Sequence, residues 1–217
     1  MTDTQRYTRA ESPKLLVDPQ AVAEREVANG LRQFDAVKAE IAKALAKGDR
    51  YRLRPSTILR LHREAVEGIE ATAGQWRNVP VDIAGSTHRP PAPEDVPELM
   101  EELCDRVNDD LRDAPPIDLA AWVLWRICWI HPFSDGNGRT ARAISYLVLC
   151  AAAGLDLPGT RTIPDQITED KAPYYEALEM IDRSVRGEEA DVGVMADLLT
   201  ALLARQIQDV EVLPDPS

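Results

Sequence analysis

Apolar residues recur every three or four positions along most of the chain, which is the spacing of one face of an α-helix. The pattern predicts helices over residues 19–47, 55–72, 95–111, 118–130, 139–153, 168–185 and 190–207. Within the first of these, Asn29-Gly30 predicts a break into two helices. Residues 118–130 are apolar on nearly every side, which predicts a helix that is buried all round.

A short stretch departs from the helical period. Val79, Val81 and Ile83 alternate with other residues, which predicts a short strand, and Gly85 predicts a turn after it. The proline-rich residues that follow cannot form the interior of a helix. We therefore expect an all-α fold, a helical bundle with a central buried helix pair and a small β-hairpin flap within residues 76–90.

Length and composition limit how many domains the chain can form. Its 217 residues, 44% of them hydrophobic, suffice for one packed core. We expect an N-terminal helical segment over residues 1–50, a central domain over 51–190, and a C-terminal helix and tail over 191–217. No apolar run reaches the roughly 20 residues of a membrane span, and the N-terminus lacks the apolar core of a signal peptide. Three cysteines without a CxxC pair favour reduced thiols, so we expect a soluble, cytoplasmic protein with no membrane partner.

The formal net charge of −12 argues against nucleic acid as a partner, because a phosphate backbone would be repelled by most of the surface. Arg139 and Arg142 stand out against this background. A local pair of arginines in an acidic chain indicates a small anionic ligand rather than a polyanion.

These arginines belong to the sequence HPFSDGNGRTAR, which lies between two apolar helices. The second helix leaves its first N–H groups without intrahelical partners, and its dipole places partial positive charge there. Gly136 and Gly138 would let these amides approach a ligand closely, and Asn137 tolerates left-handed geometry. Arg139 and Arg142 share one helix face and suit phosphate oxygens. The segment therefore predicts an anion site at a helix N-terminus.

Two further groups of the same segment indicate reaction chemistry. Asp135 is an unfavourable neighbour for phosphates unless a divalent cation bridges them, and Mg²⁺ is typically held by one or two carboxylates plus substrate phosphates. His131 is the one group here whose ordinary pKa suits proton transfer near neutrality. Together with the glycines and arginines, these groups indicate a nucleoside-triphosphate site, although GxxxxGK[ST] and GxGxxG are both absent.

The same segment resembles the Fic-domain signature HxFx(D/E)GNGRxxR, with every specified position present. The resemblance extends to LHREAVEGIEATAGQWRNVPVDIAG, PPAPEDVPELMEEL and DKAPYYEAL, and it covers residues 55–185. It implies the Fic fold, with a Fic catalytic domain over residues 51–190.

The resemblance implies a protein adenylyltransferase, which transfers AMP from ATP to a Ser, Thr or Tyr hydroxyl of a target protein and releases pyrophosphate. His131 would take the proton of that hydroxyl, and Asp135 would hold Mg²⁺ against the phosphates. The nucleotide would bind at the start of the second helix, through Gly136, Asn137, Gly138, Arg139 and Arg142.

The resemblance also implies roles for residues outside the nucleotide site. The flap, about residues 79–87, would capture the target segment by main-chain pairing. The residues expected in this role are Val81, Asp82, Ile83, Ala84 and Gly85. Phe133 would be buried and would anchor the loop to the core. Tyr174 or Tyr175 would either line the adenine pocket or pack in the core, and both interpretations stay open.

Many Fic proteins carry an inhibitory helix with the motif (S/T)xxxE(G/N), whose glutamate pairs with the second arginine of the signature, here Arg142. EREVANGLRQFD resembles the neighbourhood of that helix, but Ala28 stands at the glutamate position and Glu24 at the Ser/Thr position. Residues 1–50 are therefore expected to hold a degenerate inhibitory-helix region. We expect the chain to be active unless an antitoxin-type inhibitory partner supplies the carboxylate, and the N-terminal helices would also suit a homodimer.

Three alternatives stay open. In the first, the chain transfers another nucleotide, such as UMP, or a phosphate group; against this, Gly138 keeps a glycine that Doc-like phosphate-transferring relatives lack. In the second, the chain is a non-catalytic nucleotide-binding module. In the third, it is a metal-dependent hydrolase that uses His131 and Asp135; against this, His62 and His88 lack metal-ligand spacing.

Overall fold

The computed structural model describes residues 6–10, 14–185 and 190–211. Its helices are α1 (Pro19–Lys47), α2 (Pro55–Val66), α3 (Val96–Asp110), α4 (Pro116–Ile130), α5 (Asn137–Ala153), α6 (Ile163–Glu169), α7 (Ala172–Ser184) and α8 (Gly193–Glu211). Two 3₁₀-helices, Gly48–Arg50 and Pro93–Asp95, and two strands, β1 (Thr8–Arg9) and β2 (Asp82–Ile83), complete the elements of the described residues. The predicted all-α fold is confirmed.

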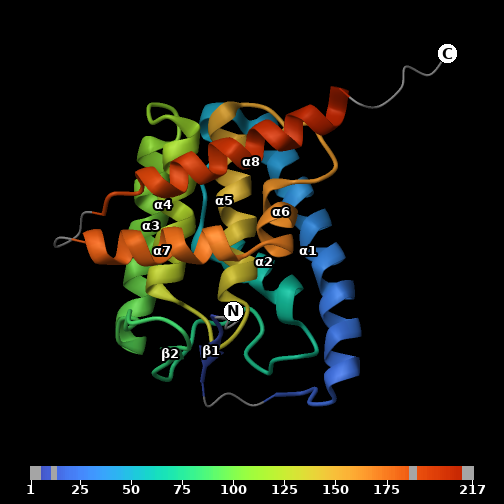
Figure 1. Ribbon diagram of the computed structural model, residues 1–217, viewed down its shortest axis with the longest axis vertical. Coiled ribbons are helices and arrows are strands. Elements are labelled where there is room, and N and C mark those ends of the chain that lie inside the picture. Colours follow the sequence, from blue (N-terminus) through green and yellow to red (C-terminus); the bar gives the residue numbers. More distant parts are fainter. Residues whose placement is uncertain (1–5, 11–13, 186–189, 212–217) are drawn as a thin grey trace.

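The two most apolar helices, α4 and α5, lie side by side at the centre of the bundle (Figure 1). α4 is buried without a break from Leu119 to Trp125 and again at Ile127 and Ile130, and α5 is buried without a break from Ala143 to Ala151. Gly154 ends α5 in the left-handed conformation, at φ 70°. Since only residues 131–136 join the two helices, the predicted polar segment lies at one end of the central pair. Figure 1 shows β1 and β2 at that end and α8 crossing near the opposite end.

One core serves all three predicted parts of the chain. Val37 and Ile41 of α1 and Met195 and Leu199 of α8 pack in the same cluster of buried side chains as α4 and α5. The division at residues 50 and 190 stays a prediction.

The predicted break at Asn29-Gly30 is wrong, because α1 is one continuous helix of 29 residues. Asn29 is fully buried, and its amide donates to the carbonyl oxygens of Ala65 and Glu67 at 3.4 and 3.0 Å. Those carbonyls lie at the end of α2, so Asn29 caps the neighbouring helix instead of breaking its own. A side-chain hydrogen bond to a distant carbonyl has no signature in the local pattern.

Two other predicted helices have different bounds. The helix expected over 55–72 ends at Val66, and Gly68 leaves it with φ 77°. The helix expected over 168–185 begins only at Ala172, where Pro173 lacks the N–H that continuation from α6 would need. Residue 168 belongs to α6 instead.

Cys104, Cys128 and Cys150 are free thiols, as predicted. None of the helices in the described part of the chain combines the length and the apolar content that crossing a bilayer requires.

Candidate active site

The segment between α4 and α5 begins with a residue in a rare backbone conformation. His131 ends α4 with φ 53° and ψ 57°, and it has the only positive φ of a non-glycine residue among those described. This conformation costs about 1–2 kcal/mol, so other contacts must hold it. The His131 carbonyl accepts a hydrogen bond from Nε of the buried Arg77 at 2.8 Å, and the same guanidinium donates to the Pro91 carbonyl at 2.7 Å. Arg77 therefore ties the histidine backbone to the segment that follows the flap.

The hydrogen bonds of the His131 ring fix its tautomer. Nδ1 lies 3.2 Å from the carbonyl oxygen of Cys128, and a carbonyl can only accept, so Nδ1 carries the hydrogen. Nε2 then holds a lone pair, and it lies 2.8 Å from the hydroxyl oxygen of Thr8. Burial, together with the charges of Arg77 and Arg6, lowers the pKa of His131 to about 3. The ring is therefore neutral at pH 7, with a basic nitrogen in contact with a hydroxyl.

The flap presents its backbone to an extended segment. Thr8 pairs with Ile83 and Arg9 with Asp82 in an antiparallel register, and the Ala84 amide donates to the Tyr7 carbonyl at 2.9 Å. The predicted small antiparallel β-element is thus present at Asp82–Ile83. Its second strand, however, comes from β1 near the N-terminus and not from the flap itself.

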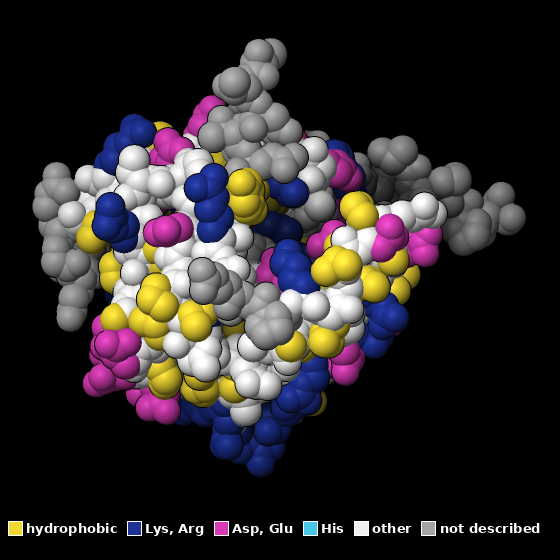
Figure 2. Space-filling view, turned by 90° about the horizontal axis from the view of Figure 1, so that it is seen from below, with side chains coloured by type: hydrophobic (Ala, Val, Ile, Leu, Met, Phe, Trp, Pro, Cys, Tyr) yellow, Lys and Arg dark blue, Asp and Glu magenta, His cyan; other side chains and the backbone are white. Residues whose placement is uncertain are grey.

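A cleft of about 810 Å³ lies between β1, the flap and the polar loop, and this volume is within the range of ligand sites. Its lining residues are Tyr7, Thr8, Arg9, Ala10, Lys14, Glu70, Val79, Pro80, Val81, Asp82, Ser134 and Asp135. Figure 2 views this end of the molecule, where basic and acidic side chains surround a recess. The cleft brings together Asp135 and the flap residues Val81 and Asp82, and their expected roles stay predictions.

The loop is held from inside by two of the predicted residues. Asn137 is 2% exposed; its Oδ1 accepts from the Phe133 amide at 2.9 Å and its Nδ2 donates to the Phe133 carbonyl at 2.7 Å. Phe133 is fully buried, as expected. Because the Asn137 side chain is occupied by these bonds, its main-chain N–H is the group that it offers to an anion.

His62 also holds the loop. Its ring stacks on Phe133, with the ring centroids 3.6 Å apart. Nδ1 accepts from the Gly74 amide at 3.0 Å, and Nε2 lies 3.0 Å from the Asp135 carbonyl and must donate to it. Burial lowers the pKa of His62 to about 4. This histidine therefore supports the backbone beside Asp135.

Positions 136 and 138 differ in why a glycine is present there. Gly136 has φ 75°, and a Cβ there would lie 2.6 Å from Cγ1 of Val66, so the loop packs directly on α2. Gly138 is helical, and a Cβ there would approach only the Arg142 guanidinium, at 3.2 Å. Packing on α2 thus explains the glycine at position 136, and the close approach of its amide to a ligand stays a prediction.

The charged residues of the loop form a small network. Oδ1 of Asp135 accepts from the Gly136 amide and lies 3.3 Å from a guanidinium nitrogen of Arg139. The other side of Arg139 pairs with Glu26 of α1 at 3.0 Å. Since Glu26 lies two positions before Ala28, α1 does bring a carboxylate to the signature, but to its first arginine.

Few metal-binding side chains surround Asp135. Among the described residues, no group of three or more His, Cys, Asp or Glu side chains could hold an ion. A site with fewer than three such side chains does not suit zinc, but it fits Mg²⁺, which keeps several waters and binds largely through substrate phosphates. Asp135 therefore fits a cation that arrives with a nucleotide.

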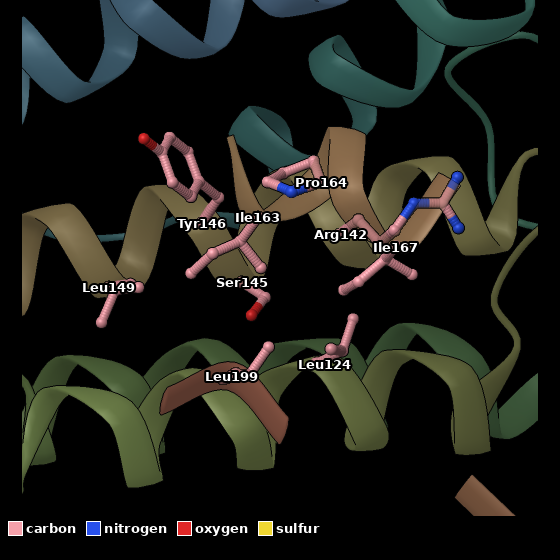
Figure 3. Close-up of a pocket in the computed structure, with 9 residues that line it drawn as sticks. All are labelled: Leu124, Arg142, Ser145, Tyr146, Leu149, Ile163, Pro164, Ile167 and Leu199. Atoms are coloured by element: carbon pink, nitrogen blue, oxygen red, sulfur yellow. The ribbon is translucent and has the colours of Figure 1, made fainter. Parts of the chain in front are cut away.

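Arg142 does not line the main cleft. It borders a pocket of about 10 Å³, which has room for no more than a water. Figure 3 shows its guanidinium extending toward the N-terminal end of α5, away from Tyr146 and Leu149. No acidic side chain in the described parts of the chain forms an ion pair with Arg142.

Of the two tyrosines left open by the sequence, Tyr174 packs in the core. It is 2% exposed, and its hydroxyl lies 2.9 Å from the Cys128 sulfur. Tyr175 donates from its hydroxyl to the Arg6 carbonyl at 3.4 Å, so it contacts the segment that contains β1.

Sequence reasoning missed Thr8, Arg6, Arg77 and His62. A signal existed for His62, because it is a polar residue on the predicted apolar face of residues 55–66. No local pattern marks β1, since a two-residue strand is too short for alternation to be recognised.

The bundle with a central helix pair, joined by this loop and faced by a flap, defines a Fic-type fold. Residues 52–149 match the model of the Fic/DOC family. The matched residues are a little under half of the chain, and they identify a Fic/DOC-type domain within it. Its fold is similar to that of a Fic domain containing signaling protein from Bacteroides thetaiotaomicron, whose crystal structure it matches with a TM-score of 0.72. The two sequences are 24% identical, and the match covers 89% of this chain and 73% of the other.

Curated relatives match a similar part of the chain. "Protein adenylyltransferase Fic" of Nematostella vectensis is 34% identical over 125 residues, which are 56% of this chain and 27% of the relative. "Protein adenylyltransferase fic-1" of Caenorhabditis briggsae is 30% identical over 151 residues, or 68% and 28% of the two chains. The chain thus spans about a quarter of the length of these relatives.

Proposed function

We propose that this chain is a protein adenylyltransferase, which transfers AMP from ATP to a hydroxyl of a protein target and releases pyrophosphate. One observation carries the proposal: the Nε2 lone pair of His131 lies 2.8 Å from a hydroxyl oxygen, at the N-terminal end of α5. The names of the curated relatives, each a protein adenylyltransferase, point to the same activity.

His131 acts as the general base. Its Nδ1–H is held by the Cys128 carbonyl, so the ring cannot rotate freely, and Nε2 receives the proton as the hydroxyl oxygen attacks the α-phosphorus. The bond from that phosphorus to the bridging oxygen breaks, and pyrophosphate leaves. Arg77 fixes the backbone of the base through the His131 carbonyl.

The start of α5 binds the phosphates. The main-chain N–H groups of Asn137, Gly138 and Arg139 are those that a helix leaves without intrahelical partners, and the helix dipole adds partial positive charge. Arg139 and Arg142 bind the β/γ end of the triphosphate, and Asp135 is the residue that would hold Mg²⁺. When bound, Mg²⁺ neutralises part of the phosphate charge that would otherwise repel Asp135.

The flap binds the target. Asp82 and Ile83 offer main-chain groups to an extended segment, and Val81, Ala84 and Gly85 flank them. The occupation of this edge by β1 supports the role, because it is the same type of pairing that a target would use.

Regulation by a partner follows from the residue at position 28. Ala28 has no carboxylate to offer Arg142, so the isolated chain is active, and an antitoxin-type partner or a second copy of the chain would be needed to supply one. The test is the rate of AMP transfer per molecule of the purified chain, measured over a series of dilutions. We expect activity without any partner and a rate per molecule that does not change on dilution. An inactive chain that gains activity when α1 is mutated would contradict it.

The reaction itself is tested with ATP labelled either at the α- or at the γ-phosphate. The purified chain, Mg²⁺ and a cell lysate are incubated with each, and labelled proteins are counted. We expect label only from α-labelled ATP, together with released pyrophosphate, and no transfer after chelation of the metal. Label from γ-labelled ATP would mean phosphate transfer, and no label from either would leave a nucleotide-binding module.

Arg139 and Arg183 form a matched pair for the nucleotide site, since each is in an i,i+4 ion pair with an acid. Arg139→Ala is expected to lower kcat/KM for ATP by about 10- to 10²-fold, the value of a hydrogen bond to a charged group. Arg183→Ala, on α7, should leave it unchanged. Equal effects of the two substitutions would argue against phosphate binding by Arg139.

A further inference from the structure

The segment around β1 occupies the position that a protein target would take. It lies along the edge of the flap in antiparallel register, with Thr8 opposite Ile83 and the Tyr7 carbonyl bonded to the Ala84 amide. Beyond the strand, the Leu15 amide donates to the Ile69 carbonyl at 2.8 Å. The chain thus crosses its own cleft, whose lining includes Tyr7, Thr8 and Arg9.

Thr8 has the contacts of a nucleophile. Since Nδ1 of His131 carries the hydrogen of the ring, the hydroxyl of Thr8 must be the donor to Nε2, over 2.8 Å. The same oxygen lies 3.3 Å from Nδ2 of Asn137, which can only donate to it. The proton of Thr8 is therefore directed at the base, and its oxygen lies beside the first residue of α5.

Anchors before the strand keep Thr8 in place. The Arg6 side chain is 8% exposed, pairs with Asp182 at 3.6 Å and donates to Oγ of Ser86 at 2.6 Å. The Tyr175 hydroxyl donates to the Arg6 carbonyl. One guanidinium nitrogen of Arg6, Nη1, is buried without a hydrogen-bond partner in the described structure. A buried cation with a spare N–H beside the base suits an anionic oxygen of the nucleotide.

We propose that Thr8 is an acceptor of the chain's own adenylyl transfer, within one molecule. Oγ of Thr8 attacks the α-phosphorus of ATP, its proton passes to Nε2 of His131, and the bond to the pyrophosphate oxygen breaks. The product is a phosphodiester between Thr8 and AMP, with pyrophosphate released. The inference rests on the proposed function and adds to it a specific acceptor in this sequence.

The test uses the full chain with ATP and Mg²⁺, followed by intact mass and peptide mapping. Three variants are compared with the original sequence. Thr8→Val keeps the shape and the strand preference of threonine but removes the hydroxyl, and Thr8→Ser keeps a hydroxyl. Thr168→Val is the control, because Thr168 is an exposed threonine on α6.

We expect one added AMP on the peptide that contains Thr8 in the original chain, in Thr8→Ser and in Thr168→Val. Thr8→Val should carry no label on that peptide. Self-labelling that is found only on residues other than Thr8, or undiminished self-labelling of Thr8→Val, would overturn the proposal. The loss of self-labelling in Thr168→Val alone would overturn it as well.

Transfer within one molecule is tested by mixing. The His131→Ala chain, which keeps Thr8, is incubated with the Thr8→Val chain, which keeps the base. We expect no label on the His131→Ala chain, and a first-order rate of self-labelling of the original chain that does not change over about a tenfold dilution. Label on the His131→Ala chain would show transfer between molecules and would overturn the intramolecular step.

The lysate assay separates this proposal from the proposed function. If the original chain labels lysate proteins from α-labelled ATP but never Thr8, the proposed function stands and the assignment of Thr8 is wrong. If neither the original chain nor Thr8→Val transfers AMP to itself or to any other protein, both are wrong.

Discussion

His131 and His62 invite comparison because they share almost everything that is used to recognise a catalytic histidine. Both are buried, at 7% and 1% exposure, and both contact the loop between α4 and α5. Burial lowers the pKa of each, to about 3 for His131 and about 4 for His62. Burial and pKa alone therefore do not tell the two apart.

The two rings differ in what their nitrogens contact. Both nitrogens of His62 are bonded to main-chain groups, the Gly74 amide and the Asp135 carbonyl. His131 has one nitrogen on a main-chain carbonyl and the other on a side-chain hydroxyl. A ring whose two nitrogens are bonded to the backbone is a structural element, whereas a ring with one nitrogen left for a side chain can exchange a proton with a ligand.

The largest expected effect separates the two by activity. His131→Ala should reduce adenylyl transfer by about 10²- to 10⁴-fold, because it removes the proton acceptor. The measurement is the rate of AMP transfer at saturating ATP, with the folded fraction checked by circular dichroism. A variant that is folded and transfers AMP as fast as the original chain would remove His131 from the reaction.

The second effect separates the two by stability. His62→Ala should lower the free energy of unfolding by about 2–4 kcal/mol, since it opens a cavity against Phe133 and leaves the Gly74 amide and the Asp135 carbonyl without partners. Urea unfolding measures this value. His62→Phe is the matched variant, because it keeps the stacking on Phe133 and loses only the hydrogen bonds. Its free energy of unfolding should lie between those of the original chain and His62→Ala. Equal stability of all three chains would contradict the role of His62.

The smallest effect is a shared dependence on pH. Both pKa values lie below the ordinary 6.5, so the unfolded chain binds more protons than the folded chain between about pH 3 and pH 6.5. Stability should therefore fall as the pH is lowered through this range, by at most about 1.4 kcal/mol per pH unit for each histidine. Urea unfolding at several pH values should give a shallower slope for His62→Phe, and an unchanged slope would mean that His62 titrates normally when folded.

The central helix pair and the loop could be predicted from the sequence because their signals are local. Residues 118–130 are apolar all round, and the signature HPFSDGNGRTAR has fixed spacings. Its roles in the reaction stay predictions until they are tested. The burial of Phe133 followed from the same short stretch.

The rest depends on contacts between distant parts of the chain. Thr8 and Ile83 pair through the backbone, which leaves no trace in the choice of side chains. The sequence predicts that Asn29 breaks a helix. In the structure it lies within α1 and stabilises it there, because its side chain donates to two carbonyls at the end of α2. The reason for Gly136 likewise lies in Val66, on a different helix.

The ion pair between Glu26 and Arg139 has a consequence for nucleotide entry. Both side chains are partly exposed, at 46% and 23%, and such pairs contribute about 0–1 kcal/mol. An incoming phosphate can therefore displace Glu26 with a loss of only about 0–1 kcal/mol. Arg139 would then exchange one anionic partner for another. On the proposed function, a bound nucleotide would replace this single contact between α1 and Arg139, while Asn29 would keep α1 bonded to the end of α2.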